Sequence, residues 1–278
     1  MVIGQMGHCR KHGCSLCRPL RNAVHEVIGY RHHGVMISVA GQGLVLPFDV
    51  ELYGPGDSEY EAGRRPLRRA VGNLGARFAD YVVADGEFAT APFLHTAGEV
   101  GLHVVARVKE NLPELVAAVR ARWEGQPPHA TFWEGPDRIE VWDAADFDPW
   151  DTLRWPTVRV LRYRQYTPTG DVIDATWLTD FPPHLVDSRT LYRMAKTRWT
   201  IENQGFNDAK TRYGLDHLCH HEANSVVILW LLTAFAMTIE RLYRLRYLHR
   251  GTHPARAAID VVRALRMSLG ERVRIDTG

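Results

Sequence analysis

Two short apolar runs with a helical stretch between them constrain the fold of this chain more than any other feature. The runs are "YVVAD" at residues 81–85 and "LHVVARVK" at residues 102–109, and residues 90–100 between them suit a helix. Strand, helix and strand joined by short connections are typical of a parallel crossover unit. The chain is therefore expected to be an α/β protein.

A hairpin and a helix are expected before this unit, and a second helix after it. Residues 35–40 and 44–52 are β-rich runs that flank a Gly-Gln-Gly turn. Residues 66–78 place four apolar side chains on one helical face, and residues 112–123 suit one further helix. Up to this point the pattern agrees with one layered α/β unit.

The composition then changes, which indicates an insertion. Residues 126–181 are rich in Pro, Trp and Asp, and "ATFWEG", "RIEVWD", "TVRVLRY" and "VIDATWLT" are expected to be four mostly antiparallel strands. From Ser188, an expected N-cap, the chain turns helical, with further helices near residues 222–248 and 254–268. The chain thus divides into residues 1–110, a β-rich insertion at residues 111–187 and a helical part at residues 188–278.

Charge and cysteine content bound the class of protein. The net charge is +2, but residues 8–33 hold five Lys or Arg and five His against one Glu, and residues 241–278 hold nine Arg against three acids. Both stretches suit an anionic polymer, with two solvated surfaces as the alternative. The N-terminal residues have no apolar core of signal-peptide length, and four Cys argue against a disulfide framework. We therefore expect a reducing compartment.

One apolar segment needs a membrane check. Residues 223–239 carry no charge and are strongly apolar. This length is at the short limit for a spanning helix, which needs about 20 residues. We expect a buried core helix and no membrane.

Glu202 stands on a helical stripe that is otherwise apolar. A carboxylate facing the core is costly unless it is paired or bound to a metal, so Glu202 needs a partner. An ion pair with Arg198, one turn back, is the alternative to a functional role. The stripe runs at steps of three and four residues through Tyr192, Ala195, Trp199, Glu202, Phe206, Ala209 and Tyr213.

Asp85 follows the carboxyl end of an apolar strand and precedes Gly86. Ligands bind at that edge of open α/β sheets, although an Asp there is often only a turn residue. An acid at a strand end and another on a later helix can converge on divalent metal, which clamps the oxygens of a phosphoryl displacement. Arg198, Lys210 and Arg212 add cations that suit a phosphodiester.

Taken together, these segments resemble the DDE transposases of bacterial insertion elements, in the group with a β-rich insertion before the last acid and a Y-R-E-K signature on the following helix. Arg198 and Glu202 keep the spacing of the signature, and Lys210 follows the acid by eight residues, as in members that read "IENxGFNxxK". Ala195 departs from the signature Tyr, although Tyr192 lies one turn earlier. "VVADGEFA" resembles the segment with the second catalytic Asp, and "YRHHGVMIS", "LVLPFDVE" and "HVVARVKEN" resemble the strands around it.

The resemblance implies an RNase H-like mixed sheet with helices on both faces, whose catalytic core is split by the β-rich insertion. It implies metal-dependent DNA strand cleavage and transfer at element ends. Asp85 and Glu202 would then be the catalytic ligands of a two-metal Mg²⁺ or Mn²⁺ site, and Arg198 and Lys210 would contact DNA. The implied partners are double-stranded DNA and a second copy when DNA is bound, in the bacterial cytoplasm.

The first acid of that family is missing from this chain. Its expected position falls within "MVIGQMG", near Gly4, and no acid precedes Glu26. A truncated or misplaced start and a decayed copy both explain the gap. Asp49 or Glu51 could also take the place of the missing acid, but both belong to the segment that matches a later strand of the family. The chain is therefore an incomplete catalytic domain or a non-catalytic DNA-binding remnant, with a nuclease unrelated to transposition as a third hypothesis.

A separate group of cysteines offers soft ligands for zinc. The spacing C-x4-C-x2-C holds one pair with a standard knuckle spacing, and "LCHHE" at residues 218–222 is a further source of ligands. The alternative is a set of reduced thiols in a loop. The group consists of Cys9, Cys14 and Cys17, interleaved with His8 and His12.

Overall fold

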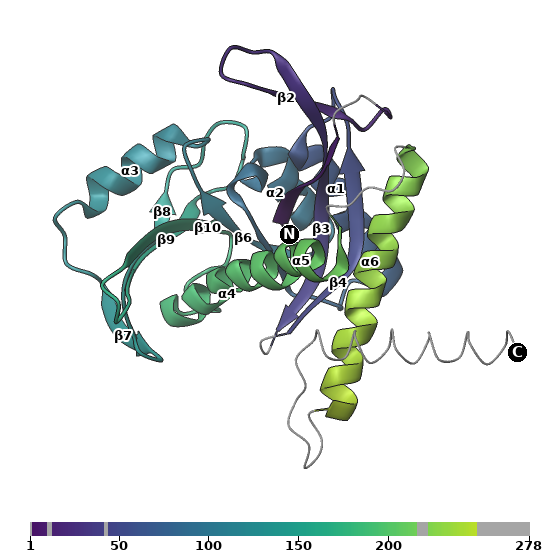
Figure 1. The fold of residues 1–278 in the computed structure, drawn as a ribbon. Coiled ribbons are helices and arrows are strands. Elements are labelled where there is room, and N and C mark those ends of the chain that lie inside the picture. The colour runs from purple at the N-terminus through teal and green to yellow at the C-terminus, as the bar shows by residue number, and fades with distance from the viewer. Residues whose placement is uncertain (1, 10–12, 42–43, 216–221, 249–278) are drawn as a thin grey trace, which may run out of the picture.

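The computed structural model describes residues 2–9, 13–41, 44–215 and 222–248. They form two β-sheets with helices against them (Figure 1). In the first sheet, three strands pair antiparallel with one long central strand. Its strands are β1 (Val2–Cys9), β2 (Arg18–Arg21), the central β3 (Val27–Gly41) and β4 (Leu44–Tyr53).

The second sheet has six strands in the order β5-β6-β10-β9-β8-β7. Only β5 and β6 are parallel; the other pairs are antiparallel. The strands are β5 (Tyr81–Ala84), β6 (His103–Val108), β7 (Ala130–Glu134), β8 (Asp137–Phe147), β9 (Val158–Tyr166) and β10 (Val172–Thr179).

Helices pack against both sheets, and one of them contacts strands of both. The segment α4 contacts β3 of the first sheet and β5, β6 and β9 of the second (Figure 1). The helices are α1 (Glu59–Leu74), α2 (Ala91–Glu99), α3 (Pro113–Trp123), α4 (Ser188–Ile201), α5 (Asp208–Tyr213) and α6 (Ala223–Tyr243), with a 3₁₀ turn at Gly86–Phe88 and π-helical segments at Glu202–Asn207 and Arg244–Leu248.

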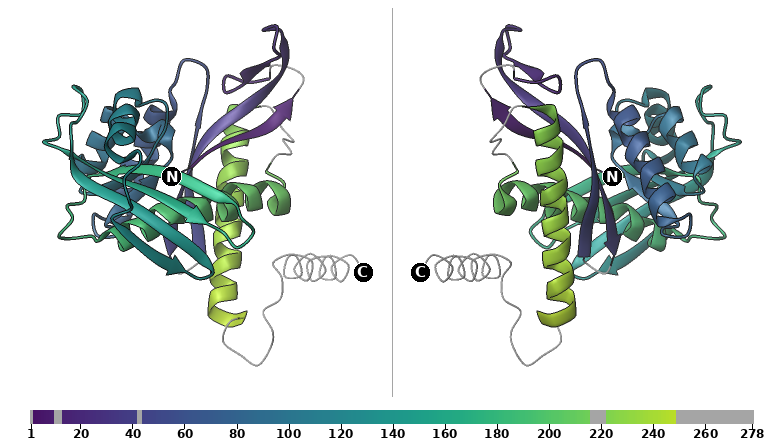
Figure 2. Two further views of the ribbon diagram at one scale, coloured as in Figure 1. Left: turned by 90° about the vertical axis from the view of Figure 1, so that its left-hand side faces the viewer. Right: turned by 90° about the vertical axis from the view of Figure 1, so that its right-hand side faces the viewer.

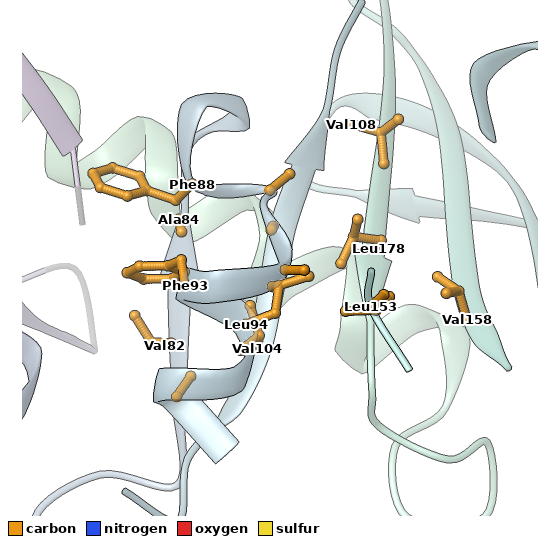
Figure 3. Packing of buried hydrophobic residues seen from close by; sticks show 14 of the residues in the cluster. Val82, Ala84, Phe88, Phe93, Leu94, Val104, Val108, Leu153, Val158 and Leu178 are labelled. Atoms are coloured by element: carbon orange, nitrogen blue, oxygen red, sulfur yellow. The ribbon is translucent and has the colours of Figure 1, made fainter. Parts of the chain in front are cut away.

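The expectation of an α/β protein with a mixed sheet and flanking helices is confirmed. In the crossover unit β5–α2–β6, alternate strand residues face opposite ways because the side-chain period of a strand is two. Val82 and Val104 pack with Phe93 in one cluster of buried hydrophobic side chains (Figure 3). Val83 and Val105 belong to a second cluster on the opposite face, which includes Leu191, Tyr192 and Ala195 of α4.

The four strands expected in the insertion are present as β7 to β10. They extend the sheet of the crossover unit, because β10 pairs antiparallel with β6. The backbone groups on that side of β6 are thereby satisfied within the sheet. The division of the chain into residues 1–110, 111–187 and 188–278 stays a prediction.

Two helix starts differ from the sequence-based expectation. The helix expected at residues 66–78 begins at Glu59, because Ser58 caps it by accepting a hydrogen bond from the Glu61 amide at 3.3 Å. Asp187, and not Ser188, caps α4, since its carboxylate accepts from the Thr190 amide at 2.8 Å. A serine, threonine or acid near a helix start therefore identifies the cap only to within a residue or more.

The apolar segment of residues 223–239 forms most of α6, which is buried along one face only. The expectation of a buried core helix is correct for that face. One face packs on β4 through Val226, Trp230 and Met237 (Figure 2). By length and composition, residues 223–246 are apolar enough to cross a membrane, and 33% of the most apolar window is buried. The absence of a membrane stays a prediction. The other face exposes Ile228, Leu231, Leu232, Phe235, Ile239 and Leu242.

The helix expected at residues 254–268 lies outside the described residues. So do most of the basic C-terminal stretch and residues 216–221.

Candidate active site

Asp85 is placed by the end of β5, where the sheet stops and a 3₁₀ turn begins. Its carboxylate caps that turn by accepting a hydrogen bond from the Gly86 amide at 2.6 Å. The ammonium of Lys109, which directly follows the neighbouring strand β6, lies 3.0 Å from the same oxygen, Oδ1 of Asp85. Parallel strands end at the same edge of a sheet, so β5 and β6 bring this acid and this cation together.

Gly86 makes room for that contact. A Cβ atom at this position would lie 2.6 Å from Cδ of Lys109, closer than real side chains approach. The backbone of the turn is further held by Asn111, whose amide donates to the Gly86 carbonyl at 2.9 Å. The glycine after Asp85 therefore lets the aliphatic stem of Lys109 cross the turn and reach the carboxylate.

Arg198 of α4 joins the two acids that the sequence singled out. Its Nη1 lies 2.6 Å from Oε2 of Glu202, and its Nη2 lies 3.6 Å from Oδ2 of Asp85. The side chain is only 8% exposed, and these carboxylates offset the cost of burying its positive charge. The ion pair considered as the alternative for Glu202 exists, but the same guanidinium also reaches Asp85, which makes the three side chains one cluster.

Glu202 lies less deeply in the protein than its apolar stripe suggested. Its side chain is 39% exposed, whereas Phe206 and Ala209 on the same stripe are buried. The chain turns π-helical from Glu202 to Asn207, and a π turn shifts the phase of the side chains that follow. Glu202 can therefore face the Asp85 side while the residues after it enter the core.

The electrostatics of the cluster keep Asp85 ionised. Burial raises the pKa of Asp85, but the charges of Arg198 and Lys109, with the Gly86 amide, outweigh burial and hold that pKa below its usual range. A third cation, Arg107 of β6, lies over the Trp177 ring at 5.7 Å, and burial lowers its pKa. The acids thus sit in a strongly positive environment, which suits a phosphate group.

The other signature positions are not part of this cluster. Lys210, on α5, forms no hydrogen bond or ion pair with the described residues, and its role in DNA binding stays a prediction. Tyr192 is 2% exposed and packs edge-on against Tyr163 in the core. Arg198 faces two carboxylates, and its contact with DNA likewise stays a prediction.

Two other acids are placed away from the cluster. Asp49 and Glu51 lie on β4 and pair with α1: Arg69 lies 2.9 Å from Asp49, and Arg65 lies 2.6 Å from Glu51. Among the residues that the structure describes, Asp85 and Glu202 are the acids paired with Arg198. The structure thus places Asp49 and Glu51 against α1, outside the cluster of Asp85, Glu202 and Arg198.

Sequence reasoning left the role of Lys109 open and did not consider Arg107 or Asn111. The signal for Lys109 was its position, because it ends the strand that runs parallel to the strand before Asp85. Arg107 gave no such signal, because an Arg within an apolar run is usually expected to be a solvated side chain. Its place beside Trp177 follows only from the pairing of β6 with β10.

The donor set of the cluster fits a hard divalent cation. Mg²⁺ binds through one or two carboxylates and completes its shell with water and phosphate oxygens, and Asp85 and Glu202 already converge on one cation, Arg198. An ion between them would compete with Arg198 and Lys109 for the same oxygens. These two carboxylates would supply two ligands, where a two-metal site needs further oxygens.

Comparison with known proteins places the chain in a family. The family described as "Transposase DDE domain" matches residues 24–239, a span that contains both acids. The cryo-EM structure of the piggyBac transposase synaptic complex with hairpin DNA is similar, with a TM-score of 0.54 and 12% identity, over 96% of this chain and 51% of that chain. This chain thus spans about half the length of that transposase, and the likeness shows the fold alone. No curated protein matches the chain. Because the family match extends over most of its 278 residues, the chain belongs to the transposase DDE domain family.

Proposed function

We propose that this chain is the catalytic domain of an insertion-element transposase of the group with the Y-R-E-K signature, which cleaves and transfers DNA strands at element ends. The observation that carries the proposal is the convergence of Asp85 and Glu202, more than a hundred residues apart in the sequence, on the buried Arg198. The family match supports transposition as the process.

The chemistry would be metal-assisted phosphoryl transfer. Asp85 and Glu202 would hold Mg²⁺ or Mn²⁺, which would activate a water molecule or a 3′ hydroxyl of DNA and stabilise the leaving oxygen. Lys109 and Arg198 keep Asp85 deprotonated and face the phosphate, and Lys210 would contact the DNA backbone. The proposed partners are double-stranded DNA, at terminal repeats and at the target, and a second copy of the chain on DNA, in the bacterial cytoplasm.

We propose that the site is incomplete among the residues that the structure describes, because none of them forms a β-strand in the gap beside β3. A cavity of about 220 Å³ lies between β3 and β5, and residues of α4 line it as well. On the edge of β3 that faces away from β4, Ser38, Val39 and Ala40 have no strand partner among the described residues. Across the cavity, β5 pairs only with β6 among those residues. The Ser38 hydroxyl is buried without a hydrogen-bond partner.

The register of β1 indicates what fits this cavity. Val2 pairs with Met36, Ile3 with Val35 and Gly4 with Gly34, so positions before Val2 in the same register fall opposite Ile37 to Ala40. Those β3 residues line the cavity together with Tyr81 and Val82 of β5. A strand that continues β1 backwards would join the two sheets, and an acid on it would be the third ligand.

An engineered N-terminal strand tests the cavity. Five β-forming residues added before Met1 should raise the free energy of unfolding by about 1–3 kcal/mol, because apolar burial outweighs the ordering of a short strand only slightly. A matched extension with Pro at alternate positions should have no effect, since Pro cannot complete the ladder. Urea denaturation of both extended chains measures this. Equal stability of the two would contradict the strand site.

DNA binding and cleavage test the function itself. The 278-residue chain should bind duplex DNA with an affinity that falls as salt rises, and Lys210→Ala should reduce the salt slope by about one. The same chain should not cleave supercoiled plasmid in Mg²⁺ or Mn²⁺, because the third ligand is missing. Absence of DNA binding would overturn the proposal, and cleavage would overturn the incompleteness.

The second candidate is a DNA-binding remnant without catalytic metal. The direct pairing of Asp85 with Lys109 and Arg198 favours it, since these cations neutralise the acid without any metal. It predicts the same DNA binding but no affinity for Mn²⁺, which separates it from the catalytic domain.

A further inference from the structure

A second cluster of metal-ligating side chains lies away from Asp85, at the start of the first sheet. Cys14 and Cys17 lie in the turn before β2, and His32 lies on β3. Cys17 and His32 are almost fully buried, with exposures of 1% and 0%. The ligand atoms of the three residues all lie within 4.8 Å of one another. Of the cysteines and histidines weighed as zinc ligands from the sequence, Cys14 and Cys17 are in this group, and His32 is new.

The separations match those around a tetrahedral zinc ion. Zn–S bonds of about 2.3 Å and Zn–N bonds of about 2.0 Å place two sulfurs about 3.8 Å apart and a sulfur and a nitrogen about 3.5 Å apart. The two Sγ atoms are 3.7 Å apart, and Nε2 of His32 lies 3.1 Å from Sγ of Cys14 and 3.7 Å from Sγ of Cys17. The three ligand atoms are therefore close enough together to share one zinc ion.

The backbone around the thiols has the form of a metal-binding knuckle. The Cys17 amide donates to the Cys14 carbonyl at 3.1 Å, which closes the turn of the C-x2-C pair. Arg18, next in the chain, donates to the carbonyls of Gly54 at 3.2 Å and Asp57 at 2.7 Å. The turn is thus fixed on one side to the segment after β4, while its thiols face His32 of β3.

We propose that Cys14, Cys17 and His32 bind a zinc ion that fastens the N-terminal turn to the first sheet. Tetrahedral zinc takes a fourth ligand, and the register of β1 places Cys9 opposite Tyr30, two residues from His32 along β3. The ion is structural, since Cys17 and His32 are buried, Cys14 is half-buried, and all three belong to a different part of the fold from Asp85 and Glu202. This inference is independent of the proposed function.

The alternative is a buried histidine hydrogen-bonded to a reduced thiol. It accounts for the 3.1 Å contact with Cys14. It gives no reason for the second thiol to lie at metal-ligand separation from both other atoms. A hydrogen bond needs one partner, whereas a metal needs several that converge.

Metal analysis of the purified 278-residue chain tests the site. About one zinc per chain should be present, and Co²⁺ added after chelation should give the charge-transfer absorption of thiolate ligands. Cys17→Ser and His32→Asn should each weaken zinc binding at least about a hundredfold, because each removes a direct ligand. The matched control is His25→Asn, an exposed residue with φ 63° in a turn, a conformation that Asn tolerates.

A second readout guards against variants that merely misfold. Zinc added to the metal-free wild-type chain should raise its thermal midpoint, and the same addition should leave Cys17→Ser unchanged. Wild-type protein that holds no zinc, and gains neither stability from it nor a thiolate–cobalt band, would overturn the proposal. Zinc binding that survives both substitutions would overturn it equally.

Discussion

Asp85→Asn should weaken Mn²⁺ binding at least about a hundredfold, because it replaces a charged direct ligand, and loss of a mere supporting residue already costs 10- to 100-fold. Electron paramagnetic resonance of free Mn²⁺ in a titration measures this affinity directly. Asn keeps the size of Asp85 and the oxygen that accepts from the Gly86 amide, so the turn after β5 should survive.

The matched control for this substitution lies at the other end of the same strand. Asp80→Asn removes one exposed carboxylate just before β5 and should leave Mn²⁺ affinity unchanged. Equal affinity in wild type and Asp85→Asn would show that Mn²⁺ binds elsewhere. The pairing with Lys109 and Arg198 would then be the whole role of Asp85.

Arg159→Met should cost about 3–5 kcal/mol of the free energy of unfolding, because it leaves Asp143 buried without its counter-charge. Arg159 is 3% exposed and pairs with Asp143, which is 9% exposed. It also donates to the carbonyls of Phe181 and Val186, and Asp143 accepts from Ser188 at the start of α4. This network ties the second sheet to the helix that carries Arg198.

A surface pair of the same chemistry is the control for Arg159. Arg122 makes two hydrogen bonds to Asp146, but the side chains are 40% and 67% exposed. Arg122→Met should therefore cost less than about 1 kcal/mol. Urea denaturation followed by far-ultraviolet circular dichroism compares the two variants. Similar losses in both would contradict the structural role assigned to Arg159.

The part of the fold set by local pattern was predictable from the sequence. The crossover unit, the hairpin and the four strands after residue 126 all follow from side-chain periodicity and turn residues, which act over short stretches. What was not predictable is how strands meet over long distances. Nothing local in the stretch matching β10 indicates that it pairs with β6 and extends the same sheet.

In the candidate site, too, features with a local sequence signal were predictable and long-range contacts were not. Asp85 and Glu202 were identified from their positions at a strand end and on a helical stripe, together with the family resemblance. The π-helical segment that exposes Glu202 was missed, because its i→i+5 bonding depends on packing and has no sequence signal that we used. The contact of Lys109 with Asp85 also needed the pairing of β5 with β6.

We expect Asp85 and Glu202 to bind one divalent ion together. Diffraction from crystals soaked in Mn²⁺, with data collected at the manganese absorption edge, would locate that ion directly. An anomalous peak is expected between the two carboxylates, with Arg198 or Lys109 displaced from Asp85. A map without a peak there at saturating Mn²⁺, with both cations still on Asp85, would contradict it.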